Sequence, residues 1–313
     1  MSVTVVGSVA YDALETPWGK RDRILGGAAS HFSIAASFFT DVRLVGVVGE
    51  DFREEELDIL RARKINLDDL QQVEGAKSFF WAGRYDYDLD VAHTLDTQLN
   101  VFAEFDPQLS EAARESRALF LANIQPDLQR RVRQQCGGAR FAGLDSMNYW
   151  IDTAKDSLLE TIGLVDAVLL NDAELRMLTG KPSLAQAARA IRELGPSTVV
   201  AKLGKYGAGL FTEEGFFALP SYPLETAIDP TGAGDSFAGG FLGYLATHEP
   251  PYSDDVIRCG LVYGSVLASF NVEAFGSERL QALTEKEIDE RFREFKQMTH
   301  FEPLPARSLA ARS

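Results

Sequence analysis

Short apolar runs rich in β-branched residues alternate with helical patterns along most of the chain, and this alternation limits the possible folds more than any other feature. Buried parallel strands have this apolar character, because helices cover both of their faces. Strands are predicted at 3–9, 42–49, 118–124, 139–145, 167–174 and 197–204, and helices at 27–39, 51–63 and 184–195. The pattern predicts an α/β fold with a doubly wound, mostly parallel central sheet and helices on both faces.

One region lacks this alternation. Residues 77–104 are aromatic and β-prone, with no helical pattern of their own. Together with residues 15–24 they are predicted to form a few antiparallel strands that project from the main sheet. These strands form either a hairpin packed on the core edge or a lid over a pocket at the strand carboxyl ends. We favour the lid, because both inserts follow strands of the early sheet.

These assignments give one domain over residues 1–298, with lid segments at about 13–25 and 77–105. The last stretch, 299–313, is polar and contains two prolines. A stretch of that composition at the end of a chain is predicted to be a flexible tail.

Charge and composition exclude several classes of protein. The net charge is −15 and the isoelectric point is near 4.8, which opposes binding to nucleic acid or to an anionic membrane surface. No run approaches the roughly 18 apolar residues of a membrane span, and the N-terminus is predicted to be a strand rather than a signal peptide. Two cysteines without metal or disulfide spacing are predicted to be buried apolar groups. We therefore expect a cytoplasmic protein.

The stretch "IDPTGAGDSFAGGFLGYLA" (228–246) places Gly232, Ala233 and Gly234 before Asp235 and an apolar helix. Backbone N–H groups at such a turn converge on one point, where the helix dipole favours an anion. A carboxylate at this position would repel an anion that is only bound there. If the anion is a phosphoryl group being transferred, however, the carboxylate can take the proton of the attacking hydroxyl. Asp235 is alternatively a helix N-cap, and the stretch alone leaves both interpretations open.

The longer string "DPTGAGDSFAGGF" (229–241) closely resembles the C-terminal signature of the ribokinase-like, or PfkB, family of carbohydrate kinases. Further matches follow the family's order and spacing over nearly the whole chain: "GGAASHFSIAA" (26–36), "VGVVGEDF" (45–52), "NDAE" (171–174) and "KLGKYGAG" (202–209). The resemblance implies an ATP-dependent kinase. It implies Asp235 as the general base, and the backbone of Gly232, Ala233 and Gly234 as the anion hole.

The same resemblance implies the nucleotide and metal positions. Asn171 and Glu174 would organise Mg²⁺, which accompanies ATP, through water. Lys202, Gly204 and Gly207 would line the triphosphate.

The resemblance also implies roles for two residues at the start of the 229–241 motif and for one residue after it. Asp229 and Thr231, with carbonyl groups near 274–276, would hold a monovalent cation such as K⁺. Asn271 would lie beside the adenine, or it is a helix C-cap.

On the acceptor side, the resemblance implies that Asp12, Gly26 and Gly27 hold the substrate. The sequence departs from the family here, because Ala28 and His31 stand where relatives often have asparagines. The loss of two amides removes hydrogen-bonding capacity towards a polyol. His31 either replaces one amide or is a helix histidine with internal partners. Asp145 would support the substrate site or cap the next helix.

The most favoured function is therefore an ATP-dependent sugar kinase that phosphorylates a small carbohydrate. The alternative is a nucleoside kinase of the same family, since the missing amide at Ala28 and an aromatic lid suit a flat base. A non-catalytic sugar- or nucleotide-binding regulator is the least favoured function, because a binding protein has no need of a base. The expected partners are ATP, the acceptor and a second copy of the chain, joined through the lid. Burying the lid's strand edges and aromatic side chains would explain that homodimer.

Overall fold

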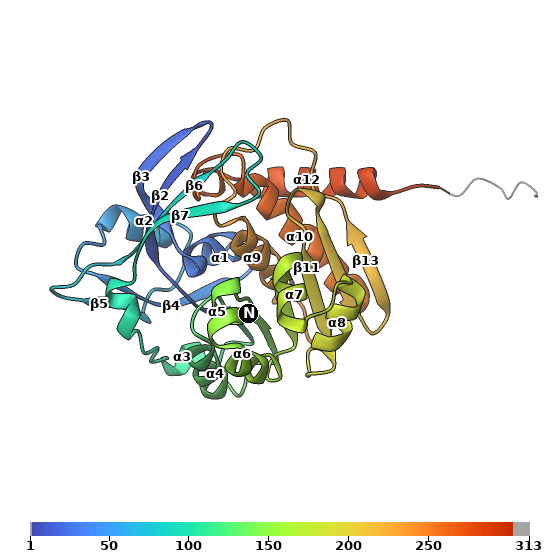
Figure 1. Cartoon of the computed structure of the whole chain (residues 1–313), viewed down its shortest axis with the longest axis horizontal. Helices are drawn as coiled ribbons and strands as arrows, with labels where there is room; N and C mark the ends of the chain where they lie inside the picture. Colours follow the sequence, from blue (N-terminus) through green and yellow to red (C-terminus); the bar gives the residue numbers. More distant parts are fainter. Residues whose placement is uncertain (1, 303–313) are drawn as a thin grey trace, which may run out of the picture.

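A nine-stranded sheet forms the centre of the computed structural model, which describes residues 2–302 (Figure 1). Its strand order is β13-β12-β11-β10-β9-β8-β1-β4-β5. All neighbours pair in parallel except β11–β12 and β12–β13, which pair antiparallel at one edge. The strands are β1 (Ser2–Val6), β4 (Asp41–Gly49), β5 (Leu70–Val73), β8 (Ala118–Leu121), β9 (Phe141–Leu144), β10 (Ala167–Asn171), β11 (Thr198–Lys202), β12 (Ala208–Thr212) and β13 (Gly215–Leu219).

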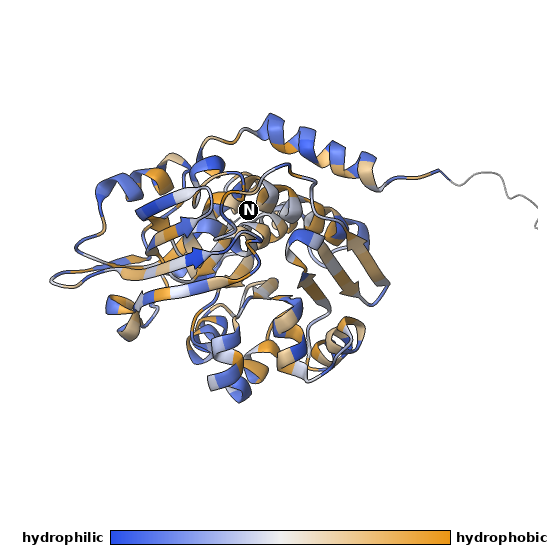
Figure 2. Cartoon of the chain, turned by 45° about the horizontal axis from the view of Figure 1, so that its top comes forward, coloured by the Kyte–Doolittle hydropathy of each residue, from blue (hydrophilic) through white to orange (hydrophobic). Residues whose placement is uncertain are grey.

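Helices cover both faces of this sheet, and alternate strand residues enter two separate hydrophobic clusters. One cluster joins the sheet to α1 (Ala28–Ala36), α2 (Glu54–Ala62), α9 (Ala233–Leu245), α10 (Asp254–Asn271), α11 (Glu278–Gln281) and α12 (Glu285–Thr299). The other joins it to α3 (Glu111–Arg114), α4 (Pro126–Gln135), α5 (Asn148–Thr153), α6 (Lys155–Ile162), α7 (Asp172–Thr179) and α8 (Leu184–Arg192). Figure 2 shows the hydrophobic colour concentrated in the interior, whereas α12 is largely hydrophilic. The predicted doubly wound α/β class is confirmed.

A second, four-stranded sheet stands beside the main body in the order β3-β2-β6-β7 (Figure 1). Its strands are β2 (Ala10–Thr16), β3 (Gly19–Gly26), β6 (Phe79–Tyr85) and β7 (Ala92–Gln98). The predicted antiparallel pairing is found at β2–β3 and β6–β7, whereas the central pair β2–β6 is parallel. In the chain, β2 follows β1 and β6 follows β5. Since β1 and β5 run parallel in the main sheet, β2 and β6 enter the small sheet in the same direction. We call this second sheet the small sheet.

Three further details differ from the prediction. The small sheet begins at Ala10, and the stretch predicted to lack a helix ends in a 3₁₀ turn, η1 (Asn100–Glu104). Helix α12 continues through Thr299, the first residue of the predicted flexible tail, and 303–313 of that tail lie outside the described residues. Among residues 2–302, no helix is long and apolar enough to cross a membrane.

Candidate active site

The turn before α9 is shaped by Gly232, which adopts a left-handed conformation with φ of 74°. Helix α9 is almost entirely buried, and its glycines let neighbouring helices approach closely. A Cβ on Gly239 would lie 2.4 Å from the carbonyl oxygen of Phe32 in α1, and one on Gly240 would lie 2.7 Å from that of Tyr263 in α10. The apolar, glycine-rich sequence after Asp235 is therefore a packing requirement that fixes the start of α9 in the core.

The N–H groups of this turn are not all free. The Ala233 N–H donates to the carbonyl of Pro230 at 3.2 Å, and the Asp235 N–H donates to its own carboxylate. Of the three residues predicted for the anion hole, Ala233 thus has an internal partner. An incoming anion would find the N–H groups of Gly232 and Gly234.

His31 and Asn271 lie beneath the turn in one buried network. The Asn271 amide donates to the Thr231 carbonyl at 2.8 Å, and its oxygen accepts from Ser236 at 2.9 Å and from His31 Nδ1 at 3.2 Å. His31 therefore carries its proton on Nδ1. Burial lowers the His31 pKa to about 4, although the bond to Asn271 opposes this shift, so the ring is neutral at pH 7.

The structure bears on the C-cap alternative for Asn271, whereas its place beside the adenine stays a prediction. Asn271 is fully buried at the end of α10, and its three polar contacts are all internal. It is not the C-cap, since Val272 occupies that position. The His31 ring packs so closely on Gly232 that a Cβ there would lie 2.3 Å from Nδ1. Both side chains act as supports for the turn.

Asp235 lies within electrostatic range of Lys202 and Asp145. The Lys202 ammonium pairs with Asp145 at 2.5 Å, and it would lie 3.2 Å from a Cβ on Gly234. These residues meet because β9 and β11 end at the same edge of the sheet. Asp145, predicted on the acceptor side, therefore contacts the lysine that was predicted to line the triphosphate.

The charged groups of this cluster shift one another's pKa values. Burial raises the pKa of Asp235 to about 7, with a further increase from Asp145 and an opposing effect from Lys202. Burial also raises the Glu174 pKa to about 7 despite the attraction of Lys202. Burial lowers the pKa of the Lys202 ammonium, but Asp145, Glu174 and Asp235 outweigh it, so the pKa is raised overall. A carboxyl group that titrates near neutral pH beside a fixed cation is suited to accept a proton.

Asn171 and Glu174 form a capping box at the start of α7. The Glu174 N–H donates to the Asn171 side chain at 2.8 Å, and the Asn171 N–H donates to Glu174 Oε2 at 2.8 Å. This reciprocal pair fixes both side chains at the carboxyl end of β10. One carboxylate oxygen of Glu174 remains outside the box.

Asp229 ties the α9 turn to a distant loop. Its two carboxylate oxygens accept from the N–H groups of Thr231 at 2.9 Å and Gly276 at 2.8 Å, and its side chain is fully buried. The two segments predicted for a monovalent cation are thus held together. The Thr231 hydroxyl also donates to the Tyr85 hydroxyl at 3.1 Å, which links the turn to the small sheet.

The loop after β11 contains the two remaining predicted glycines. Gly204 has φ of 56° and starts a 3₁₀ turn, η2 (Gly204–Tyr206). Gly207 has φ of 108°, and a Cβ there would lie 2.0 Å from the Leu219 carbonyl oxygen. Between them, Lys205 pairs with Asp90 at 2.6 Å. Sequence reasoning missed this ion pair, because Asp90 lies in the β6–β7 turn and is remote in sequence.

On the acceptor side, Asp12 lies on β2 and is 5% exposed. Its carboxylate accepts a hydrogen bond from the Gly27 N–H, and a Cβ on Gly26 would lie 2.1 Å from it. Burial, with repulsion from Asp229 and Asp235, raises its pKa to about 8. The predicted residues Asp12, Gly26 and Gly27 are therefore brought together within electrostatic range of Asp235.

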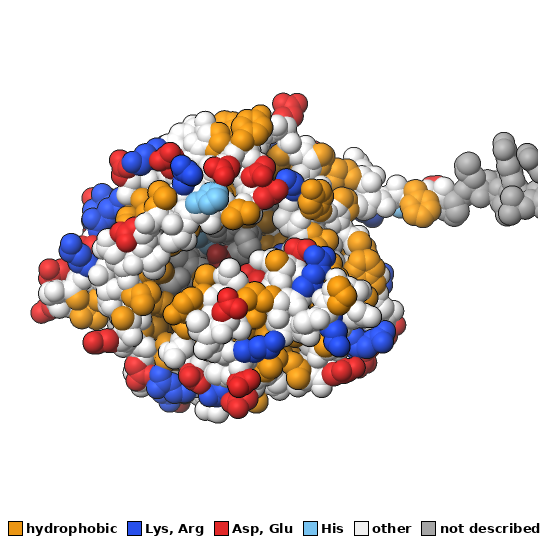
Figure 3. Space-filling model, in the orientation of Figure 1, with side chains coloured by type: hydrophobic (Ala, Val, Ile, Leu, Met, Phe, Trp, Pro, Cys, Tyr) orange, Lys and Arg blue, Asp and Glu red, His pale blue; other side chains and the backbone are white. Residues whose placement is uncertain are grey.

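Two aromatic residues on the same face of the small sheet were not singled out as site residues. Trp81 is the direct cross-strand partner of Asp12, so both side chains lie on one face. Its indole covers Gly83, where a Cβ would lie 2.2 Å from the ring. Tyr85 lies on this face as well, since it bonds Thr231. Figure 3 shows the molecule hollowed between the small sheet and the main body, with acidic side chains inside the hollow.

Comparison with known proteins identifies the family of this chain. The pfkB family carbohydrate kinase model matches residues 3–281. The cytidine kinase of Thermococcus kodakarensis is 29% identical over 83% of this chain and 94% of that protein. The nucleoside kinase of Methanothermobacter thermautotrophicus is 29% identical over 83% of this chain and 82% of that protein.

Among solved structures, the Burkholderia thailandensis nucleoside kinase in complex with inosine superposes with a TM-score of 0.79. It is 20% identical and covers 93% of this chain and 97% of that one, so it supports the fold. Since the family match extends over most of the chain, the protein belongs to the PfkB family of carbohydrate kinases and is a phosphotransferase with a hydroxyl acceptor.

Proposed function

We propose that this kinase phosphorylates a sugar hydroxyl of a nucleoside, with ATP as the donor. The observation that carries this choice is the pairing of Asp12 with Trp81 on the face of the small sheet that contacts the α9 turn. A carboxyl group beside a flat aromatic ring suits a molecule with both hydroxyls and a base, because indole and base rings stack. The names of the cytidine kinase and nucleoside kinase relatives, at 29% identity, support the same choice.

Asp235 is proposed as the general base. As the hydroxyl oxygen bonds to the γ-phosphorus and the bond to the β-phosphate oxygen breaks, Asp235 takes the hydroxyl proton. The N–H groups of Gly232 and Gly234 would stabilise charge on the transferred group, and the Lys202 ammonium beside Gly234 would add to that field. His31 and Asn271 keep the turn in place.

The family implies ATP with a divalent metal, and the residues present fit Mg²⁺ held through water. Glu174 has one carboxylate oxygen outside the capping box, and Asn171 has its oxygen already bonded to the Glu174 N–H. A hydrated Mg²⁺ could be held by such oxygens through its water shell. Among residues 2–302, no group of three or more His, Cys, Asp or Glu residues is arranged to bind a metal directly. The metal would neutralise charge on the phosphates.

A monovalent cation such as K⁺ is proposed at the junction of Asp229 and the loop near Gly276. Both oxygens of the Asp229 carboxylate already accept an N–H group, so a cation there would draw on backbone carbonyls and the outer lone pairs of Asp229. Gly204 and Gly207 are proposed to give the triphosphate close access to the backbone of their loop.

The small sheet is proposed to act as a lid, and two contacts hold it over the site. Tyr85 bonds Thr231 beside the anion hole, and Asp90 pairs with Lys205 in the nucleotide loop. Closure over both substrates would exclude water and limit ATP hydrolysis. A cytoplasmic homodimer joined through this lid remains part of the proposal. Its physical support is strand β7, which is exposed along its whole length at the sheet edge.

The test is ATP turnover, measured as ADP release with Mg²⁺, against cytidine, adenosine, inosine, ribose and fructose. We expect stimulation by a nucleoside, and loss of it in Asp235→Asn. Trp81→Ala should raise the nucleoside KM about tenfold through lost stacking, and leave ribose turnover little changed. Stimulation by a free sugar alone would select the small-sugar kinase that the sequence first favoured. Nucleotide binding without stimulation by any acceptor would favour the regulator.

A further inference from the structure

Thr231, the residue before Gly232, has a partner for each of its polar groups. Its N–H donates to Asp229 at 2.9 Å, and its carbonyl accepts from the Asn271 amide at 2.8 Å. Its hydroxyl donates to the Tyr85 hydroxyl at 3.1 Å. Asp229 and Asn271 belong to the main body, whereas Tyr85 is the last residue of strand β6 in the small sheet. The small sheet therefore supplies one of the restraints on the residue that leads into the turn.

The Thr231 carbonyl determines where the Gly232 N–H points. The two groups belong to one peptide unit, which is planar and trans, so they point in opposite directions. Asn271 holds the carbonyl, and the N–H therefore points away from Asn271, where an anion can reach it. The His31 ring limits movement of this unit, because it packs directly against Gly232. The direction of the N–H thus depends on how firmly Thr231 is held.

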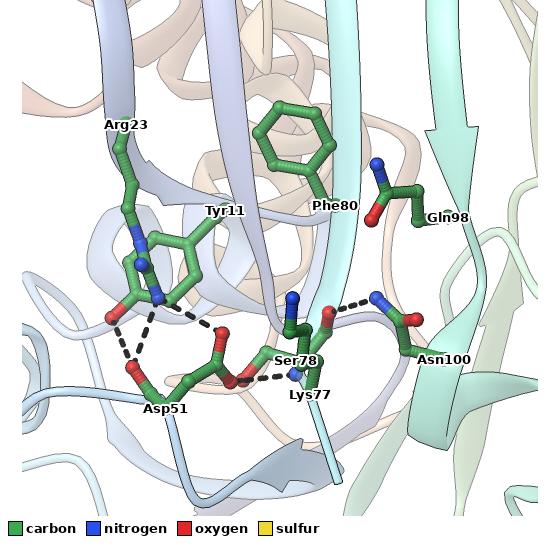
Figure 4. Close-up of a pocket in the computed structure, with 8 residues that line it drawn as sticks. All are labelled: Tyr11, Arg23, Asp51, Lys77, Ser78, Phe80, Gln98 and Asn100. Carbon is green, nitrogen blue, oxygen red and sulfur yellow. Dashed lines mark hydrogen bonds and ion pairs between the residues drawn. The ribbon is translucent and has the colours of Figure 1, made fainter.

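The opposite end of β6 is attached to the main body. The Asp51 carboxylate accepts from the backbone N–H and the hydroxyl of Ser78 at 2.7 and 2.8 Å, and from Arg23 at 3.0 Å (Figure 4). The Tyr11 hydroxyl donates to the Asp51 carbonyl at 3.3 Å. Asp51 follows β4 of the main sheet, and Ser78 directly precedes β6. A movement of the small sheet that keeps this attachment would pivot there, so it would be largest at the far end of β6, where Tyr85 lies.

Two surface ion pairs also hold the far end of the small sheet. Arg21 pairs with Glu278 at 3.0 Å, and Lys205 pairs with Asp90 at 2.6 Å. These four side chains are between 41% and 48% exposed, and exposed pairs contribute little to stability. Burial, by contrast, raises the pKa of the Tyr85 hydroxyl to about 12, so its contact is shielded from water. Opening this end of the sheet therefore costs little at the ion pairs but breaks a shielded hydrogen bond to the turn.

We propose that Tyr85 is a positioning residue for phosphoryl transfer, through which the anion hole depends on the position of the small sheet. In the position that the structure shows, Tyr85 and Asn271 both hold Thr231, and the Gly232 N–H is directed at the transferred group. When the sheet pivots away, Thr231 loses its hydroxyl partner and the N–H is held less firmly. Closure thus completes the anion hole, in addition to excluding water. This role of Tyr85 rests on the anion hole of the proposed function, but not on which acceptor is phosphorylated.

The first test is a double-mutant cycle between Tyr85→Phe and Thr231→Val, with kcat and KM measured for whichever acceptor is active. Each single variant should lower kcat about fivefold, the effect of one hydrogen bond, and change the acceptor KM by less than about twofold. The double variant should be no slower than the slower single variant, because both substitutions remove the same bond. Thr231→Ser keeps the hydroxyl and should recover most of the kcat lost in Thr231→Val. Tyr87→Phe is the matched control, since it removes a hydroxyl from a side chain that is 82% exposed in the β6–β7 turn, and it should change neither constant.

The second test needs no acceptor. ADP with aluminium fluoride resembles the phosphoryl group in transfer, so its affinity reports on the anion hole, whereas ADP alone reports on the nucleotide loop. In calorimetric titrations with Mg²⁺, Tyr85→Phe should weaken the aluminium fluoride complex about fivefold and leave the affinity for ADP alone unchanged. If this holds while nucleosides fail to stimulate turnover, the role of Tyr85 stands and only the proposed acceptor is refuted.

Four results would overturn the proposal. The first is a wild-type kcat in Tyr85→Phe with a raised KM, which would make Tyr85 an acceptor contact alone. The second is additive losses in the double variant, which would mean that Tyr85 and Thr231 act separately. The third is an aluminium fluoride complex that Tyr85→Phe weakens no more than it weakens ADP alone. The fourth is a lowered Tm in Tyr85→Phe with unchanged kinetics, which would give the hydrogen bond a structural role only.

Discussion

Replacing Asp235 with Asn should remove turnover and, at the same time, stabilise the folded protein above neutral pH. The carboxyl group is buried near Asp145, so its pKa is raised from 3.8 to about 7 even though Lys202 opposes the shift. A raised pKa means that the folded protein holds the charged form less well than the unfolded chain does. Asn has the shape of the carboxyl group without the charge, so it removes this unfavourable burial.

The size of the effect follows from the shift. One pKa unit corresponds to about 1.36 kcal/mol, so a shift from 3.8 to about 7 sets an upper limit of roughly 4 kcal/mol. Asp235 is only partly buried by accessible surface, so solvent screens part of this penalty, and we expect about 1–3 kcal/mol. For a chain of this length, that gain raises the Tm by roughly 2–5 °C.

The dependence on pH has a definite sign. Between about pH 4 and pH 7 the folded wild type binds more protons at Asp235 than the unfolded chain, so its stability falls as the pH rises. The advantage of Asp235→Asn should therefore be absent near pH 4 and complete above pH 7. Thermal unfolding of both proteins at pH 4, 6 and 8 measures it, with Asp152→Asn at an exposed position as the control.

Turnover is measured on the same samples. Loss of a general base costs about 10²–10⁴-fold in kcat, and the wild-type kcat should rise as the pH passes through about 7. A variant with wild-type turnover would remove Asp235 from the chemistry. A variant that is less stable than the wild type at pH 8 would contradict the account of its electrostatic environment.

Three further substitutions test the turn and its neighbours. Gly232→Ala should destabilise the protein by about 2–4 kcal/mol in urea unfolding, because φ is 74° and the new Cβ would meet the His31 ring; unchanged stability would contradict the packing described here. Lys202→Met should cost about 3–5 kcal/mol in the same assay, since it leaves the Asp145 carboxylate, 5% exposed, without its partner. Glu174→Gln should raise the Mg²⁺ concentration needed for half-maximal turnover about tenfold, with the KM for the acceptor unchanged; an unaltered Mg²⁺ dependence would separate Glu174 from the metal.

The main sheet was predictable from sequence because its signal is local. Each parallel strand is a short apolar run between helical patterns, as at β10 and β11, and burial on both faces requires that composition. The glycine turn before Asp235 was predictable for a similar reason, since a left-handed residue and close helix packing both demand glycine. The family match over residues 3–281 agrees with the resemblance stated from those motifs.

Contacts between distant segments were not predictable in this way. No local pattern indicates that Asn271 closes a buried network with His31, or that Asp145 pairs with Lys202. These partners are brought together by strand order and helix packing, which depend on the whole chain.

The sequence by itself therefore determined the α/β class, the glycine turn before Asp235 and the residue types around it, because each depends on residue spacing and side-chain chemistry. The tertiary structure decided which charges meet and which face each strand residue takes. The parallel pairing of β2 with β6 places Trp81 beside Asp12 on one face and Phe80 beside Tyr11 on the other, and strand direction and register are set only when the whole sheet assembles.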